Sequence, residues 1–167
     1  MIVYLVGFMG AGKTSVGGRL AELLGWSFVD LDRRIEQREG EPIRDLFRRK
    51  GEPYFRRIER EELLRASTET ETVVALGGGA FCSPENQQIV HDTGASIWLD
   101  APLDLLFERC ADDQTRPLFT TRDEMRQLLD RRRPFYAQAE LHIEVAGLTV
   151  DEISRRILAA PFFQGKA

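Results

Sequence analysis

A glycine-rich segment near the N-terminus constrains the fold of this chain more than any other feature. Residues 7–14 read GFMGAGKT, which matches the pattern G-x-x-x-x-G-K-[S/T]. The apolar run Ile2–Val6 precedes it, and an amphipathic helical pattern follows from Lys13. In such a strand–loop–helix context, backbone N–H groups turn toward phosphate oxygens and the helix N-terminus adds positive potential. The segment therefore predicts a nucleoside-triphosphate site, in which Lys13 reaches the phosphates and the Thr14 hydroxyl ligates Mg²⁺.

The rest of the chain alternates short apolar segments with helical patterns. A charged, helical stretch at 31–67 is broken at 40–42 and at 51–53, and only the residues from Pro161 onward look like a tail. Alternating strands and helices predict an α/β fold with a parallel sheet covered on both faces. After the first strand, further strands are expected at 27–30, 72–76, 95–99 and 141–145.

Length and composition exclude several classes of protein. A chain of 167 residues suits a single domain, and none of its apolar runs approaches the roughly 20 residues of a membrane-spanning helix. A net charge of −4 argues against a generic nucleic-acid binder, so the Arg-Arg-Arg segment 131–133 is interpreted as a solvated helix face. Cys82 and Cys110 lack zinc-site spacing, and the first apolar run lacks a basic leader. A cytoplasmic location is therefore expected.

The remaining motifs narrow the kind of nucleotide-binding protein. A guanine-reading Asn-Lys-x-Asp motif is absent, since Asn86 is the only asparagine and Gln87 follows it. Motor and helicase NTPases usually place an acidic residue at the end of an apolar strand, where this chain has Ala75-Leu76-Gly77. A small-molecule kinase is the class that remains.

Three short motifs are candidates for the acceptor site of such a kinase. Asp30 and Asp32 are expected on one side of an extended segment at a strand end, where one can orient Mg²⁺ and the other can draw a proton from a hydroxyl. Arg56 suits bidentate capture of a carboxylate, with Glu59 one helical turn away to hold it. Gly77–Gly79 suggests that a ligand approaches the backbone closely.

A polar segment at 111–120, between two capped helical patterns, is expected to form a mobile lid. Arg116 in this segment could stabilise charge on the transferring phosphoryl group when the lid is closed.

Six motifs follow one another along the chain: Gly7–Thr14, Asp30/Asp32, Phe55-Arg56, Gly77–Gly79, Arg116-Pro117-Leu118 and Arg132-x-Pro134-x-Tyr136. Their order and spacing resemble those of the shikimate kinases over essentially the whole chain. The resemblance implies ATP-dependent phosphorylation of the 3-hydroxyl of shikimate, in the pathway to chorismate and aromatic amino acids. It also implies a three-layer P-loop fold with a five-stranded parallel sheet of order 2-3-1-4-5, a substrate-binding subdomain at about 31–66 and a lid at about 111–120.

The same resemblance assigns a role to each matching position. Lys13, Asp32 and Arg116 would be catalytic, with Asp32 the base, while Thr14 and, through water, Asp30 would hold Mg²⁺. The shikimate site would comprise Asp32, Arg56, Gly77, Gly78, Gly79 and Arg132. The ATP site would comprise Gly10, Ala11, Gly12, Lys13, Thr14, Ser15, Arg109, Arg116 and Ala146.

Two other functions stay open at this point. The chain could be a kinase for another small polyol acid, such as gluconate, or a nucleotide-binding regulator without catalysis. The expected partners are ATP and shikimate alone, with no nucleic acid and no membrane, and the resemblance favours a monomer.

Overall fold

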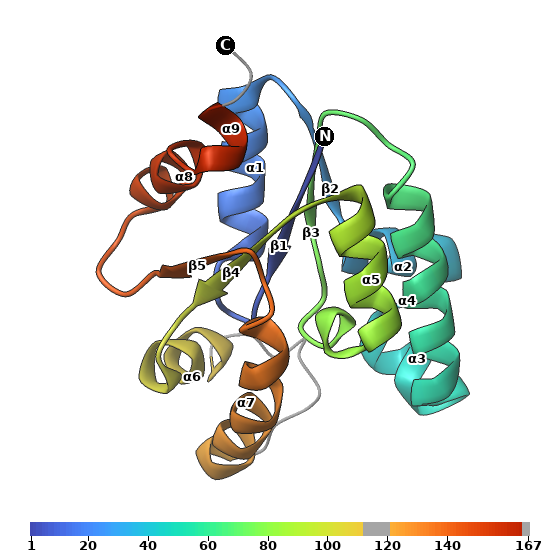
Figure 1. Cartoon of the computed structure of the whole chain (residues 1–167). Helices are drawn as coiled ribbons and strands as arrows, with labels where there is room; N and C mark the ends of the chain where they lie inside the picture. The colour runs from blue at the N-terminus through green and yellow to red at the C-terminus, as the bar shows by residue number, and fades with distance from the viewer. Residues whose placement is uncertain (112–120, 165–167) are drawn as a thin grey trace.

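A computed structural model of the chain describes residues 1–111 and 121–164, which include a parallel sheet of five strands (Figure 1). The strands lie in the order β2-β3-β1-β4-β5, so both the predicted α/β class and the predicted strand order are confirmed. Each strand lies within one or two residues of its predicted position. The bounds are β1 Ile2–Val6, β2 Ser27–Asp30, β3 Thr72–Ala75, β4 Gly94–Asp100 and β5 Leu141–Glu144.

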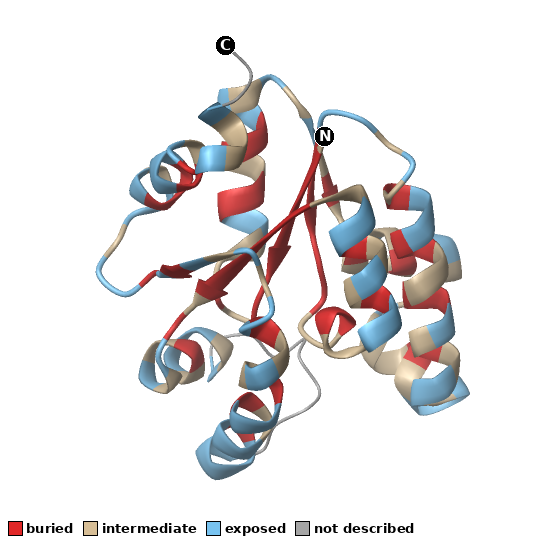
Figure 2. Ribbon diagram, in the orientation of Figure 1, coloured by how far each residue is buried: buried red, intermediate tan, exposed pale blue. Residues whose placement is uncertain are grey.

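The centre of the sheet is apolar on both faces, as a covered parallel sheet requires. All five residues of β1 are buried, and β1 pairs with β3 on one side and with β4 on the other. Figure 2 shows the same contrast between buried strands and helices with one exposed side. Because every strand runs in the same direction, the loops after their carboxyl ends gather at one edge of the sheet.

Helices cover both faces and give three layers. Helix α1 (Lys13–Leu24) packs with α8 (Val150–Leu158) on one face, and α5 (Pro84–Thr93) packs on β4 at the other (Figure 1). The sequence predicts helix starts at Ser83, which precedes a proline, and at Thr121 and Thr149, each of which has a glutamate three residues later. The structure confirms them, because these three side chains accept hydrogen bonds from amides in the first turns of α5, α7 and α8. Two more helices, α6 (Leu103–Ala111) and α7 (Arg122–Tyr136), lie beyond the carboxyl edge of the sheet, and a 3₁₀ turn, η1 (Ala80–Cys82), follows β3.

The charged stretch after β2 forms three helices that pack on one another. The predicted breaks separate α2 (Leu31–Glu39), α3 (Ile43–Lys50) and α4 (Glu52–Ala66). These helices share a small apolar core, separate from the main one, made of Ile35, Leu46, Phe55 and Ile58.

The prediction for the C-terminal segment is wrong in part. Residues Pro161–Gln164 form a short helix, α9, and the Phe163 ring lies 6.1 Å from the ring of Trp26. Four residues are too few to show helical periodicity in the sequence, so only the tertiary contact reveals that this segment packs on the body. The described residues contain no helix that is long and apolar enough to cross a membrane.

Candidate active site

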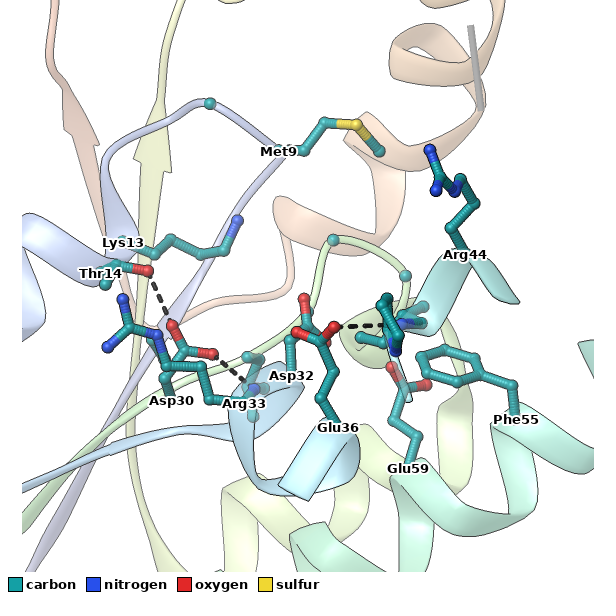
Figure 3. Close-up of a pocket in the computed structure, with 18 of the residues that line it drawn as sticks. Met9, Lys13, Thr14, Asp30, Asp32, Arg33, Glu36, Arg44, Phe55 and Glu59 are labelled. Carbon is teal, nitrogen blue, oxygen red and sulfur yellow. Dashed lines mark hydrogen bonds between the residues drawn. The ribbon is translucent and has the colours of Figure 1, made fainter. Parts of the chain in front are cut away.

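A cleft of about 900 Å³ opens at the carboxyl edge of the sheet. The loops after β1 and β3 form its floor, while helices α2, α3, α4 and α7 contribute side chains to its walls (Figure 3). It is therefore at the position where open parallel sheets bind their ligands.

The loop after β1 has the geometry of a phosphate cradle. Gly12 has a φ of 99°, which L side chains rarely adopt, and no side chain caps the start of α1. The amides of the first helical turn are thus directed into the cleft, with the positive end of the helix dipole behind them. Lys13 curls over the loop, since its Nζ donates hydrogen bonds to the carbonyls of Gly7 (2.7 Å) and Phe8 (2.9 Å).

Thr14 and Asp30 face each other on one side of this cradle. The Thr14 hydroxyl donates to Asp30 Oδ2 at 2.9 Å, and Asp30 Oδ1 accepts from the Arg33 amide (Figure 3). Mg²⁺ takes hard oxygen ligands and usually keeps several waters and substrate phosphates in its shell, so it needs only one or two protein oxygens. A hydroxyl and a carboxylate beside a phosphate cradle fit that requirement.

The prediction that Asp30 and Asp32 share an extended segment is wrong, although both carboxylates line the cleft. Asp30 ends β2 and caps α2, whereas Asp32 lies in the first turn of that helix. The chain turns into a helix here because the Asp30 side chain satisfies a free amide at the helix start.

Asp32 sits in surroundings that favour its protonated form. Burial raises its pKa to about 7, and the nearby carboxylates of Glu59 and Asp30 add to that rise, while Lys13 opposes it. A carboxyl group with a pKa near neutrality is suited to accept a proton from a hydroxyl at physiological pH.

Two arginines also line the cleft, one on α4 and one on α7. Arg56 Nη1 donates to Glu59 Oε1 at 2.8 Å, which confirms the predicted pair. Glu59 is 1% exposed, and its other oxygen, Oε2, has no hydrogen-bond partner. Arg132 is 8% exposed, so the interpretation of 131–133 as a solvated helix face is wrong for this residue. Its Nη1 also lacks a partner, and its guanidinium lies 5.6 Å from the centre of the Phe8 ring. A ligand that carries both hydrogen-bond donors and acceptors can satisfy these two buried groups.

The three glycines after β3 make room for these same side chains. A Cβ on Gly77 would lie 2.6 Å from Asp32 Oδ1, one on Gly78 would lie 3.0 Å from Arg132 Nη1, and one on Gly79 would lie 2.4 Å from Arg56 Nη2. The sequence led us to expect close approach of a ligand to this backbone. The structure adds a second reason for glycine, since each position packs against one functional group of the cleft.

Most of the sequence-predicted residues come together in this one cleft. Arg109 donates to the Gly10 carbonyl at 2.9 Å, on the side of the phosphate cradle. Ala11 is buried beneath the loop, and Ala146 is exposed after β5; neither lines the cleft as described. Arg116 and the predicted lid lie outside the described residues, except Ala111, which ends α6. The predicted residues that do line the cleft are Gly10, Gly12, Lys13, Thr14, Ser15, Asp30, Asp32, Arg56, Gly77, Gly78, Gly79, Arg109 and Arg132.

Sequence reasoning missed several residues of the cleft wall. Glu36 lies one helical turn after Asp32 and its Oε2 accepts from the Ile43 amide, so its spacing on α2 could have revealed it. Arg44 and Val150 also line the cleft, but nothing in the local sequence distinguishes them from surface residues.

Comparisons with known proteins identify the family of the chain. The family model for shikimate kinase matches residues 9–160. A shikimate kinase of Persephonella marina is 45% identical over 157 residues, which are 93% of this chain and 96% of that protein. The solved structure of a shikimate kinase from Acinetobacter baumannii in complex with shikimate has a TM-score of 0.93 at 36% identity, covering 99% of this chain and 94% of that one.

A structural similarity at lower sequence identity supports the fold alone. A gluconokinase from Sinorhizobium meliloti has a TM-score of 0.56 at 20% identity, covering 99% of this chain and 97% of that one. The family model, by contrast, spans most of the chain, and the Persephonella relative is similar over nearly its full length. The chain therefore belongs to the shikimate kinase family.

Proposed function

We propose that the protein transfers the γ-phosphoryl group of ATP to the 3-hydroxyl of shikimate, giving shikimate 3-phosphate and ADP. The observation that carries this proposal is the convergence of Asp32, Arg56 and Arg132 around Gly77–Gly79, in the same cleft as the phosphate cradle. A rigid ring that bears one carboxylate and several hydroxyls matches a pocket with two guanidinium groups and an unsatisfied carboxylate oxygen.

The proposed mechanism divides the cleft into a donor side and an acceptor side. The amides of the β1–α1 loop and Lys13 bind the phosphates, and Arg56 and Arg132 bind the acceptor carboxylate. Asp32 then orients the acceptor hydroxyl and takes its proton as the oxygen attacks the γ-phosphorus. Catalysis of this kind depends chiefly on positioning and on charge stabilisation.

Thr14 and Asp30 would hold Mg²⁺, Asp30 through a water molecule. Bound there, the ion would neutralise charge on the phosphates of ATP. The Thr14–Asp30 hydrogen bond of 2.9 Å supports this assignment, because it brings two hard oxygen ligands to the edge of the cradle.

Other parts of the proposal concern the surroundings of the cleft. Helices α2, α3 and α4 form the shikimate-binding subdomain, and residues 111–120 with Arg116 form the lid. Arg109 lies against the adenine, and Ala146 belongs to the loop that closes the adenine pocket. We propose that the protein acts as a monomer in the cytoplasm, binding neither nucleic acid nor membranes; sedimentation and fractionation of host cells would check this.

An acceptor panel with coupled detection of ADP tests the function. We expect turnover with shikimate and none with gluconate. Turnover of gluconate alone would replace shikimate kinase with a kinase for another polyol acid. The absence of ADP release with shikimate and with every other acceptor would support a nucleotide-binding regulator instead.

Substitution of the proposed base tests the mechanism. Asp32→Asn should reduce kcat for shikimate by a factor of roughly 10² to 10⁴, because the amide cannot accept the proton. The affinity for ATP, measured by calorimetry, should stay within about twofold. Asp92→Asn, on the exposed side of α5, serves as the matched control. Near-normal turnover of the Asp32 variant would remove Asp32 from the role of base.

A further inference from the structure

Tyr136, at the end of α7, contacts the Gly77–Gly79 segment that lines the cleft. Its side chain is fully buried, at 0% exposure, and its hydroxyl donates a hydrogen bond to the carbonyl of Gly78. The Cys82 thiol lies 4.0 Å from the same carbonyl, which makes it a much weaker donor. Tyr136 is thus the principal partner of the central glycine carbonyl.

This hydrogen bond fixes the orientation of one peptide group. In a planar trans peptide the C=O and the following N–H point in opposite directions. Because the Gly78 carbonyl points to Tyr136, the Gly79 amide points away from it. Within the described residues, the amides of Gly78 and Gly79 donate no hydrogen bond to a backbone carbonyl. The Ala80 amide closes this turn by donating to the Gly77 carbonyl. The central peptide of such a turn can still rotate where both of its residues are glycine, and the hydrogen bond from Tyr136 opposes that rotation.

The ring of Tyr136 is itself held from two sides. It packs against Trp98 of β4 with the ring centres 5.9 Å apart, and Arg132 lies one helical turn earlier on α7. Burial raises the pKa of Tyr136, and the neighbouring Arg132 guanidinium opposes that rise. The hydroxyl therefore stays protonated as a donor, and it lies next to the guanidinium proposed to bind the acceptor carboxylate.

We propose that Tyr136 is a positioning residue for the acceptor: its hydroxyl holds the Gly78–Gly79 peptide with the Gly79 amide available to an acceptor oxygen. The inference rests on the proposed function, since it concerns the shikimate side of the cleft. Tyr136 itself does not contact the acceptor in this arrangement.

The chain contains a closely matched control for this residue. Tyr4 of β1 is also 0% exposed, and its hydroxyl is 2.7 Å from Thr93 Oγ1. Thr93 ends α5 immediately before β4 begins, so this contact lies toward the edge of the sheet opposite the cleft. Tyr4→Phe and Tyr136→Phe each remove one buried hydroxyl and one hydrogen bond. Their effects on stability should be similar, and only the second should affect the acceptor.

The test compares these two variants with the unmodified protein. In Tyr136→Phe, we expect the KM for shikimate and its Kd by calorimetry to rise about tenfold, with kcat and the KM for ATP within about twofold. In Tyr4→Phe, all four quantities should stay within about twofold. Amide hydrogen exchange in residues 77–82 should become faster in the Tyr136 variant and remain unchanged in the Tyr4 variant, a readout that does not depend on turnover.

Two results would overturn the inference. One is a Tyr136 variant whose affinity for shikimate and whose exchange at 77–82 match those of the Tyr4 variant, which would make the hydroxyl merely structural. The other is an equal loss of affinity for ATP and shikimate, which would indicate a general disturbance of the cleft. A parent protein that neither binds nor phosphorylates shikimate would overturn the proposed function as well, so the two failures are distinct.

Discussion

Asp32 shows how the properties of a single residue depend on contacts that are remote in sequence. Its carboxyl group belongs to the first turn of α2, yet the largest influences on its pKa are burial in the cleft and Glu59 on α4. An aspartate at a helix start is otherwise a common, fully ionised residue. The chemistry proposed for it depends on α4 packing against α2.

This dependence predicts a specific pH profile. With a pKa of about 7, Asp32 is protonated below neutrality and cannot accept a proton, so kcat/KM for shikimate should rise as the pH increases through 7. Glu59→Gln removes one of the charges that raise the pKa of Asp32, so the acidic limb should move to lower pH. Steady-state rates of the unmodified protein and of Glu59→Gln between pH 5 and 9 measure the acidic limb of each. A limb at the same pH in both proteins would contradict the assignment.

Gly79 offers a second test at the scale of a residue. In Gly79→Ala the new Cβ would meet the end of the Arg56 side chain, which is flexible enough to move aside. We therefore expect a folded protein in which the KM for shikimate rises about tenfold, since the displaced Arg56 no longer reaches the carboxylate. Gly18→Ala, where nothing lies within 4 Å, is the control for the substitution itself. An unchanged KM would exclude Arg56 from acceptor binding.

At the scale of elements, local sequence predicted where helices and strands begin and end. The caps at Ser83, Thr121 and Thr149 and the two breaks at 40–42 and 51–53 act within a few residues, so their effects could be read without the fold. Close packing between two elements, such as α1 and β2, could not be predicted from the local sequence. Gly17 and Gly18 are adjacent in α1, and nothing in the sequence distinguishes them.

The structure distinguishes these two glycines through their neighbours. A Cβ on Gly17 would lie 2.3 Å from the Phe28 ring of β2, whereas a Cβ on Gly18 would face open space. Gly17→Ala should therefore lower the free energy of unfolding by about 1–3 kcal/mol through overpacking. Gly18→Ala should raise it by about 0.5–1 kcal/mol, because alanine favours a helix. Urea denaturation of both variants measures the difference, and changes of the same sign would refute this view of α1.

At the scale of the whole molecule, the proposed active site and the packing of the C-terminal helix lie at opposite edges of the sheet. The cleft lies at the carboxyl edge, whereas Trp26, just before β2, meets α9 at the opposite edge (Figure 1). The overall charge of −4 likewise hides a local excess of positive charge in the cleft, where four basic residues are proposed to bind or lie against two anionic substrates. Lys13, Arg56, Arg109 and Arg132 reach it from four different segments of the chain.

This separation predicts that some variants change stability alone. Phe163→Ala should lower the free energy of unfolding by about 1–2 kcal/mol, because a partly buried ring loses its contact with Trp26. Both KM values and kcat should stay within about twofold. Leu64→Ala, at a side chain that is exposed on α4, should leave the unfolding free energy nearly unchanged. A marked loss of activity in the Phe163 variant would show that the two edges are coupled.

By itself, the sequence determined the phosphate cradle, the alternation of strands and helices, and the family resemblance, because these depend on residues close together in the chain or on motif order. The tertiary structure decided which side chains meet. It placed Asp32 in a helix rather than on a strand, raised its pKa through burial and Glu59, and set the three glycines against Asp32, Arg132 and Arg56. The physical reason is that close packing and desolvation act between segments far apart in sequence, so no local pattern records them.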